Sequence, residues 1–200
     1  MSENRFSLAG WLSIVAAVVL PLAFILEGIT EVALEIGDID IPWGVGPADA
    51  LFLFYAALAI YLLMEFKRLM FEYYSFREIS TVINIAIFWH IIFYGGSFIL
   101  ETLFTTVWPQ DDLGLPLFLL VFWIVGIAAA GIIDIVMGVI LLRHRSRFNM
   151  PVKVFALLII VTGFFEGTVV FSFLALLLAP ASYVAMAFIF LRRPEEVEFV

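Results

Sequence analysis

The sequence predicts an all-α fold: a polytopic integral membrane helical bundle of six transmembrane helices, arranged as three hairpins with both termini cytoplasmic. Three observations predict it: an apolar composition, apolar stretches of membrane-spanning length, and Lys and Arg confined to one side of them. Hydrophobic types form 64% of the 200 residues and charged types 14%, against roughly 45–50% and about 25% in soluble proteins. Because no soluble core of this size hides so much apolar surface, the excess is expected to face lipid.

The apolar stretches define the predicted spans within a single transmembrane domain covering residues 1–200. Four of them, at about 8–30, 48–66, 80–105 and 115–142, each approximate the roughly 20 residues that cross a bilayer. The fifth, 152–191, is long enough for two passes. A break at Glu166-Gly167-Thr168 gives spans at 152–168 and 171–191, with Pro180 kinking the last helix. A break at Pro180 is the alternative, and it leaves only eleven residues before Arg192.

The basic residues predict the orientation. With six spans and the N-terminus inside, all ten fall on the cytoplasmic side: Arg5, Lys67, Arg68, Arg77, Arg143, Arg145, Arg147, Lys153, Arg192 and Arg193. The outer loops, 31–47 and 106–114, carry acidic residues and no Lys or Arg. Positive charge on the inner side is the usual rule for membrane proteins, so the predicted location is the cell (cytoplasmic) membrane, with an N-in/C-in topology.

A short internal similarity accompanies the predicted hairpins. The segment Phe24-Ile-Leu-Glu27 recurs as Phe98-Ile-Leu-Glu101, and Gly163-Phe-Phe-Glu166 lies at the corresponding place in the third hairpin. In so apolar a chain, one shared tetrapeptide is expected by chance on the order of once. Its coincidence with the predicted spans favours a threefold internal repeat, which would be parallel about an axis along the membrane normal.

Polar residues inside the spans are candidates for a relay near the middle of the membrane. Asp134 lies on a stripe of small residues at four-residue spacing, which allows helices to approach closely. The stripe consists of Gly126, Ala130, Asp134 and Gly138. His90 and Tyr94 share a face of the preceding span. A His90–Asp134 pair would relay protons or cations, and the alternative is a purely structural hydrogen bond of about 0.6 kcal/mol.

Four acidic residues are expected near the outer ends of the spans and are candidates for a carboxylate ring: Glu27, Asp49, Glu101 and Glu166. Rings of carboxylates select cations at pore mouths, and several oxygen ligands also hold hard divalent ions such as Ca²⁺. The alternative is that these acids are hydrated near the interface and cap helix ends. The identity of any metal ion stays open.

The function expected from this inventory is that of a small multi-pass membrane transport protein or channel for a cation, proton or small solute. The alternative is a non-catalytic accessory subunit of a larger membrane complex. The sequence holds no catalytic motif, so it does not predict an enzyme, and it predicts no cofactor. The absence of Cys removes disulfides and thiolate ligands. Expected partners are the lipid bilayer and either a homo-oligomer or other membrane subunits. Nucleic acid is excluded by the net charge of −8.

Overall fold

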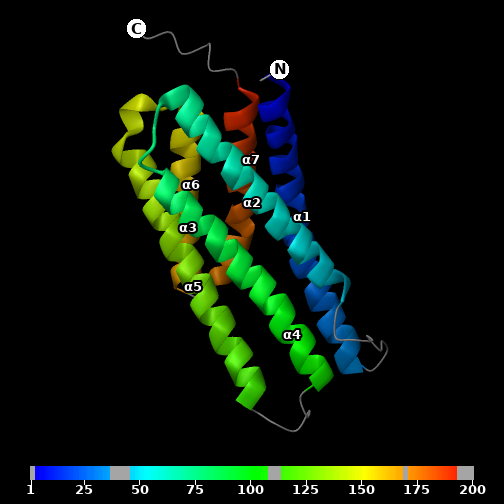
Figure 1. The fold of residues 1–200 in the computed structure, drawn as a ribbon. Coiled ribbons are helices and arrows are strands. Elements are labelled where there is room, and N and C mark those ends of the chain that lie inside the picture. The colour runs from blue at the N-terminus through cyan, green and yellow to red at the C-terminus, as the bar shows by residue number, and fades with distance from the viewer. Residues whose placement is uncertain (1–2, 37–45, 108–113, 169–170, 193–200) are drawn as a thin grey trace.

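The structure is a computed structural model that describes residues 3–36, 46–107, 114–168 and 171–192. Within these ranges the regular elements are all helical (Figure 1). In chain order they are α1 (Glu3–Ile36), α2 (Pro47–Tyr74), α3 (Ser80–His90), the π-helix η2 (Ile91–Gly95), α4 (Gly96–Val107), α5 (Gly114–Arg143), the short 3₁₀-helix η3 (Arg145–Arg147), α6 (Met150–Gly167) and α7 (Ser172–Leu191).

Among the described residues, six helical stretches are long and apolar enough to cross a membrane, which agrees with the predicted number of spans. The third stretch is composite, since α3, η2 and α4 follow one another without a break. The fifth apolar stretch ends its first helix at Gly167, and Pro180 lies inside α7. The break at Glu166-Gly167-Thr168 is therefore confirmed, and the alternative break at Pro180 is wrong.

The predicted end of the second span, residue 66, is too early. Helix α2 continues to Tyr74, through Lys67 and Arg68. Arg68 donates to the Glu65 carboxylate at 2.8 Å, one turn back on the same helix. Hydrophobicity marks where a helix leaves an apolar environment, but charged residues with good helix propensity continue it beyond that point.

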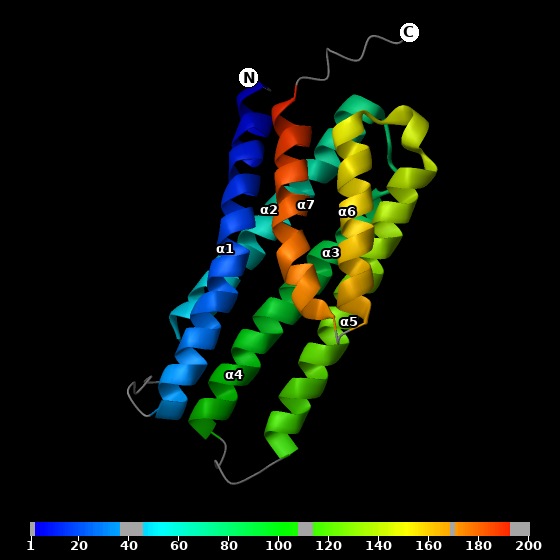
Figure 2. The same cartoon turned by 180° about the vertical axis from the view of Figure 1, so that it is seen from behind.

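The beginning of α1 and the end of α7 lie side by side at one end of the bundle (Figures 1 and 2). The rings of Phe6 and Phe190 stack with their centroids 6.3 Å apart, and a Cβ on Gly10 would lie 2.5 Å from Leu191 Cγ. Helix α1 also packs against α2, while α6 packs against both α5 and α7. The α5–α6 contact is the most extensive of these.

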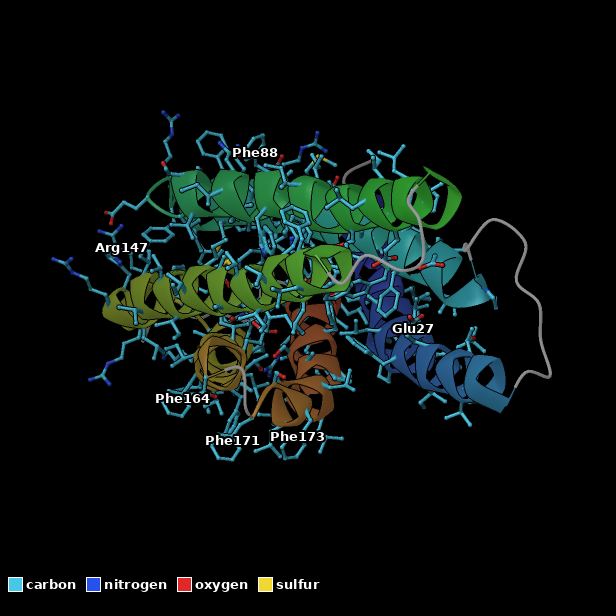
Figure 3. All side chains as sticks on the ribbon, turned by 90° about the horizontal axis from the view of Figure 1, so that it is seen from below. Glu27, Phe88, Arg147, Phe164, Phe171 and Phe173 are labelled. Carbon is cyan, nitrogen blue, oxygen red and sulfur yellow. The ribbon has the colours of Figure 1, made fainter. Side chains whose placement is uncertain are left out.

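Large apolar side chains project outward from several helices. Phe88 on one side of the bundle and Phe164, Phe171 and Phe173 on another point away from it (Figure 3). Leu177 is 71% exposed. A water-soluble monomer rarely exposes so many large apolar side chains, whereas a membrane-embedded helix presents such side chains to lipid.

The end of the bundle that carries the basic residues is closed by aromatic packing. Phe76 contacts His144 and Phe148 with centroid distances of 4.9 and 5.2 Å, and Tyr74 contacts Phe148 at 5.1 Å. His144 also lies 3.4 Å from the Glu78 carboxylate. Fully buried side chains from α2, α3 and α5 continue this core inward.

Two glycines bring α5 and α6 into backbone contact. A Cβ on Gly163 would lie 2.5 Å from the carbonyl oxygen of Gly131, and a Cβ on Gly131 would lie 2.5 Å from that of Gly163. The same added Cβ on Gly131 would lie 2.6 Å from the backbone N of Gly167. Small residues permit this kind of close crossing in membranes. The crossing fixes the helix faces on which the candidate site is built.

Candidate functional site

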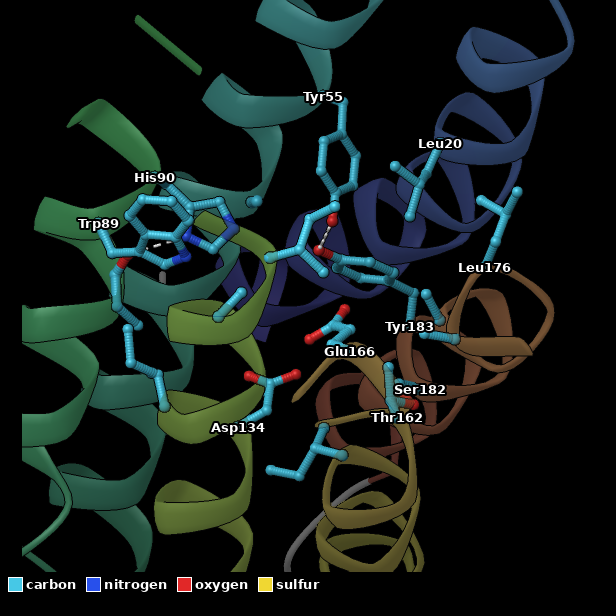
Figure 4. Close-up of a pocket in the computed structure, with 18 of the residues that line it drawn as sticks. Leu20, Tyr55, Trp89, His90, Asp134, Thr162, Glu166, Leu176, Ser182 and Tyr183 are labelled. Carbon is cyan, nitrogen blue, oxygen red and sulfur yellow. Dashed lines mark hydrogen bonds between the residues drawn. The ribbon is translucent and has the colours of Figure 1, made fainter. Parts of the chain in front are cut away.

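A central cavity of about 410 Å³ lies between the helices, with lining residues from α1, α2, α3, η2, α5, α6 and α7 (Figure 4). Its walls are mostly apolar and aromatic. The polar side chains that line it include His90, Tyr94, Asp134, Thr162, Glu166 and Ser182. None of the lining residues is Lys or Arg. The cavity therefore offers acidic and hydroxyl groups without a permanent cation beside them.

Asp134 of α5 and Glu166 of α6 come together in this cavity (Figure 4). The glycine crossing positions both: a Cβ on Gly163 would lie 3.1 Å from Asp134 Cβ, and one on Gly131 would lie 3.1 Å from Glu166 Cβ. The two carboxyl groups interact electrostatically. In the part of the chain that the structure describes, no ion pair involves either of them. Oε2 of Glu166 is buried and has no hydrogen-bond partner.

Thr162 adds a second unsatisfied group one turn before Glu166. Its side chain is only 3% exposed, and its hydroxyl has no hydrogen-bond partner among the described residues. A buried hydroxyl in a helix usually donates to a carbonyl of the preceding turn, as Ser182 does to the carbonyl of Leu178 at 3.5 Å. The Thr162 hydroxyl therefore differs from its neighbour in being available to a group inside the cavity.

Three tyrosines form a cluster beside the two acids. The hydroxyls of Tyr55 and Tyr183 are 2.6 Å apart, in a hydrogen bond between α2 and α7. The Tyr55 ring meets those of Tyr183 and Tyr94 edge to face, with centroid distances of 5.8 and 5.7 Å. The sequence analysis named Tyr94 as a candidate but missed Tyr55 and Tyr183. A hydroxyl in the middle of an apolar span was the only signal that these residues offered.

The hydrogen bond between the two tyrosines is open to a mutational test. Tyr55→Phe and Tyr183→Phe are each expected to lower the free energy of unfolding by about 0.6 kcal/mol, the average for such bonds in membranes. The free energy of unfolding of the double variant is expected to fall by about the same amount as that of either single variant, because all three variants lack the same hydrogen bond. Tyr73→Phe, which alters an exposed ring of α2, is the control and should change nothing. Unfolding midpoints in mixed micelles measure all four, and additive losses would contradict the bond.

His90 lines the same cavity as Asp134, but the structure joins them by no hydrogen bond or ion pair among the described residues. The Nδ1 atom of His90 lies 2.8 Å from the carbonyl oxygen of Ala86, on its own helix. Since a carbonyl only accepts, Nδ1 carries the proton in this bond. Direct pairing of His90 with Asp134 stays a prediction, and the group that Asp134 faces here is Glu166.

A second cavity, of about 330 Å³, collects three of the four predicted outer acids. Glu27, Asp49 and Glu101 all line it, and Glu101 interacts electrostatically with the other two. Trp123 Nε1 donates to Glu101 at 3.4 Å. Asp49 also caps α2, because its carboxylate accepts the backbone N–H of Gly46 at 2.6 Å. The predicted set of four thus divides into three acids here and Glu166 in the central cavity.

The two cavities adjoin. Phe24, Tyr94 and Trp123 line both of them, so aromatic side chains separate the two spaces. Ser97, which is 5% exposed, also lines the second cavity, and its hydroxyl has no hydrogen-bond partner in the described chain. The arrangement places a second, acidic cavity next to an acidic and aromatic central one.

Two further observations bear on what the site holds. Among the described residues, no three or more His, Asp or Glu side chains are grouped so that they could hold a metal ion. No protein-family model, curated protein or solved structure matches this chain. The geometry of the two cavities is therefore the basis for the function proposed below.

Proposed function

We propose that this chain is a small multi-pass transport protein or channel of the cell membrane that moves a cation, proton or small solute through its central cavity. In this proposal the six spans form three hairpins with both termini cytoplasmic, as the distribution of Lys and Arg indicates. One observation carries the proposal. Asp134 and Glu166 face each other inside an apolar bundle, and no Lys or Arg lines their cavity.

The cost of such an arrangement is the physical argument. A charged side chain at the centre of a bilayer costs roughly 2.5–3.5 kcal/mol on insertion scales, and a second acid beside it repels the first. A positive ligand or a bound proton relieves both penalties. Acidic residues inside membrane spans mark substrate and ion pathways for this reason, and a purely structural role is better served by a pair of opposite charge or by amides.

The outer cavity supplies an entrance in this proposal. Glu27, Asp49 and Glu101 line it, and acids at a pore mouth concentrate cations. The shared aromatic residues Phe24, Tyr94 and Trp123 then lie between the entrance and the central acids. Aromatic packing around Phe76 and Phe148 closes the opposite end, so release to that side requires this packing to open.

Flux through the purified protein in liposomes tests the proposal directly. Reconstituted protein is expected to dissipate an imposed proton or cation gradient faster than empty liposomes, in proportion to the protein added. Dyes sensitive to pH, Na⁺ and K⁺ follow the gradients. The absence of flux under every gradient, with the protein folded and inserted, would contradict transport. The accessory-subunit alternative would then be pursued by identifying co-purifying membrane chains.

The proposed orientation has its own test, helped by the absence of native Cys. Ser146→Cys, at an exposed position of η3, is expected to react with a membrane-impermeant maleimide only after cells are opened. Ala50→Cys, exposed in the first turns of α2, is expected to react in intact cells. The reverse labelling pattern would overturn the N-in/C-in arrangement.

A further inference from the structure

We propose that the central cavity binds an organic monocation: an ammonium or related positive group with apolar substituents. The positive group lies between Asp134 and Glu166, and the apolar part lies against the aromatic walls. This inference rests on the proposed function and names its substrate class. It stands on the size of the cavity, the chemistry of its walls and the groups left without partners.

The volume favours an organic ligand. At about 410 Å³, the cavity falls within the roughly 300–1,000 Å³ typical of sites for small molecules. A proton or a dehydrated metal ion would leave most of this space empty or filled with water. The walls argue against such filling, since apolar residues from α1, α5 and α7 form much of the lining.

The aromatic residues suit a weakly hydrated positive charge. Trp89, Phe93 and Trp123 line the cavity together with the tyrosine cluster. The Phe93 ring lies 4.5 Å from that of Trp89 and 4.8 Å from that of Trp123, measured between centroids. Aromatic faces attract ammonium groups, quaternary ones included. Hard inorganic cations prefer several oxygen ligands, and the described residues show no such grouping.

The polar groups without partners are concentrated at the acidic side of the cavity. Oε2 of Glu166 and the hydroxyl of Thr162 are both buried and have no hydrogen-bond partner within the described ranges, and both residues line the cavity. Unpaired buried polar groups are costly. Any positive group of a ligand offsets the negative charge of the acids, and N–H donors, where the ligand carries them, also satisfy the unpaired acceptors. The acids provide the charge, and the aromatic walls exclude water around it.

Equilibrium binding to the purified protein in nanodiscs tests this inference. The probe is benzyltrimethylammonium, and N,N-dimethylbenzamide is a neutral ligand of similar size and also soluble in water. Calorimetry measures affinity, and the fluorescence of the cavity residues Trp89 and Trp123 reports occupancy. We expect benzyltrimethylammonium to bind and the neutral amide to bind at least about tenfold more weakly, which equals about 1.4 kcal/mol.

Three variants assign the binding to this cavity. Asp134→Asn and Glu166→Gln are each expected to weaken benzyltrimethylammonium binding by about tenfold or more. Glu72→Gln, which removes an exposed carboxylate of α2 that does not line the cavity, is the matched control and should bind like the wild type. Trp89→Leu leaves both acids in place and is expected to weaken binding of the cation through the lost aromatic face.

Several outcomes would overturn the inference. Equal binding of the neutral amide would show that the cavity does not select for positive charge. Undiminished binding of the cation in both acid variants would show that it binds elsewhere. Displacement of the probe by millimolar K⁺ or Ca²⁺ would identify an inorganic cation site. Binding is measured without a gradient, so it is independent of flux. Specific binding without flux would support this inference and contradict the proposed transport function. Proton or K⁺ flux without binding of the probe would contradict this inference and support the proposed transport function.

Discussion

Asp134→Asn and Glu166→Gln are each expected to reduce flux through reconstituted protein by at least about tenfold, the largest functional effect that the structure implies. Each substitution keeps the size of the side chain and removes one of two facing carboxyl groups. Truncating the carboxylate that pairs with a buried cation commonly costs about 2–5 kcal/mol, which exceeds the cost of a tenfold change. Initial rates of gradient decay at matched protein content measure the effect.

The control for these variants is Glu72→Gln on the exposed side of α2, which is expected to keep the wild-type rate. Circular dichroism and size-exclusion chromatography confirm that each variant is folded. If a folded Asp134→Asn protein transports at the wild-type rate, the central acids do not take part in transport. A loss of flux in Glu72→Gln as well would indicate a general effect of charge on insertion.

Gly163→Ala is expected to destabilise the protein by about 1–2 kcal/mol, although alanine is normally the better helix residue by about 1 kcal/mol. The sign reverses because the new methyl group would lie 2.5 Å from the Gly131 carbonyl oxygen. This atom belongs to the backbone and cannot turn aside, so α5 and α6 must separate. The unfolding midpoint in mixed micelles, followed by circular dichroism, measures the loss.

Gly28→Ala on α1 is the matched control, because nothing lies within 4 Å of the position that its Cβ would occupy. It is expected to be neutral or slightly stabilising. Gly131→Ala should resemble Gly163→Ala, since the contact between these two glycines is reciprocal. Equal stability of Gly163→Ala and Gly28→Ala would show that the two helices do not cross as closely as described.

The spans were predictable from the sequence because hydrophobicity records the solvent around each segment. The same information does not say which helices become neighbours. Four-residue steps advance about 40° around a helix with 3.6 residues per turn, so the stripe through Asp134 turns from one neighbour to another. Its first member, Gly126, contacts Trp89 and Phe93, while Gly138 contacts Ile160 on α6.

Sequence reasoning placed Asp134 at a helix interface and predicted His90 as its partner, but it could not show that this drift turns the Asp134 position towards α6. The side chain of Asp134 lies on the part of the stripe that faces α6, where Glu166 is opposite. Glu166 was assigned to the outer ring by analogy with Glu27 and Glu101, and sequence similarity alone could not reveal that it lines a different cavity. The threefold repeat stays a prediction.

The π-helical turn η2 had no counterpart in the predicted elements, and it has a consequence for how this chain tolerates insertions and deletions. A π-turn holds about one residue more than an α-turn. Deleting one residue from Ile91–Gly95 would restore an α-helix and would avoid the rotation of about 100° that a one-residue deletion causes in a regular α-helix. Ser97 and Glu101 would then still face the second cavity, which both residues line. Related chains with an isolated one-residue gap at this point would keep both the span and the side chains that line the second cavity.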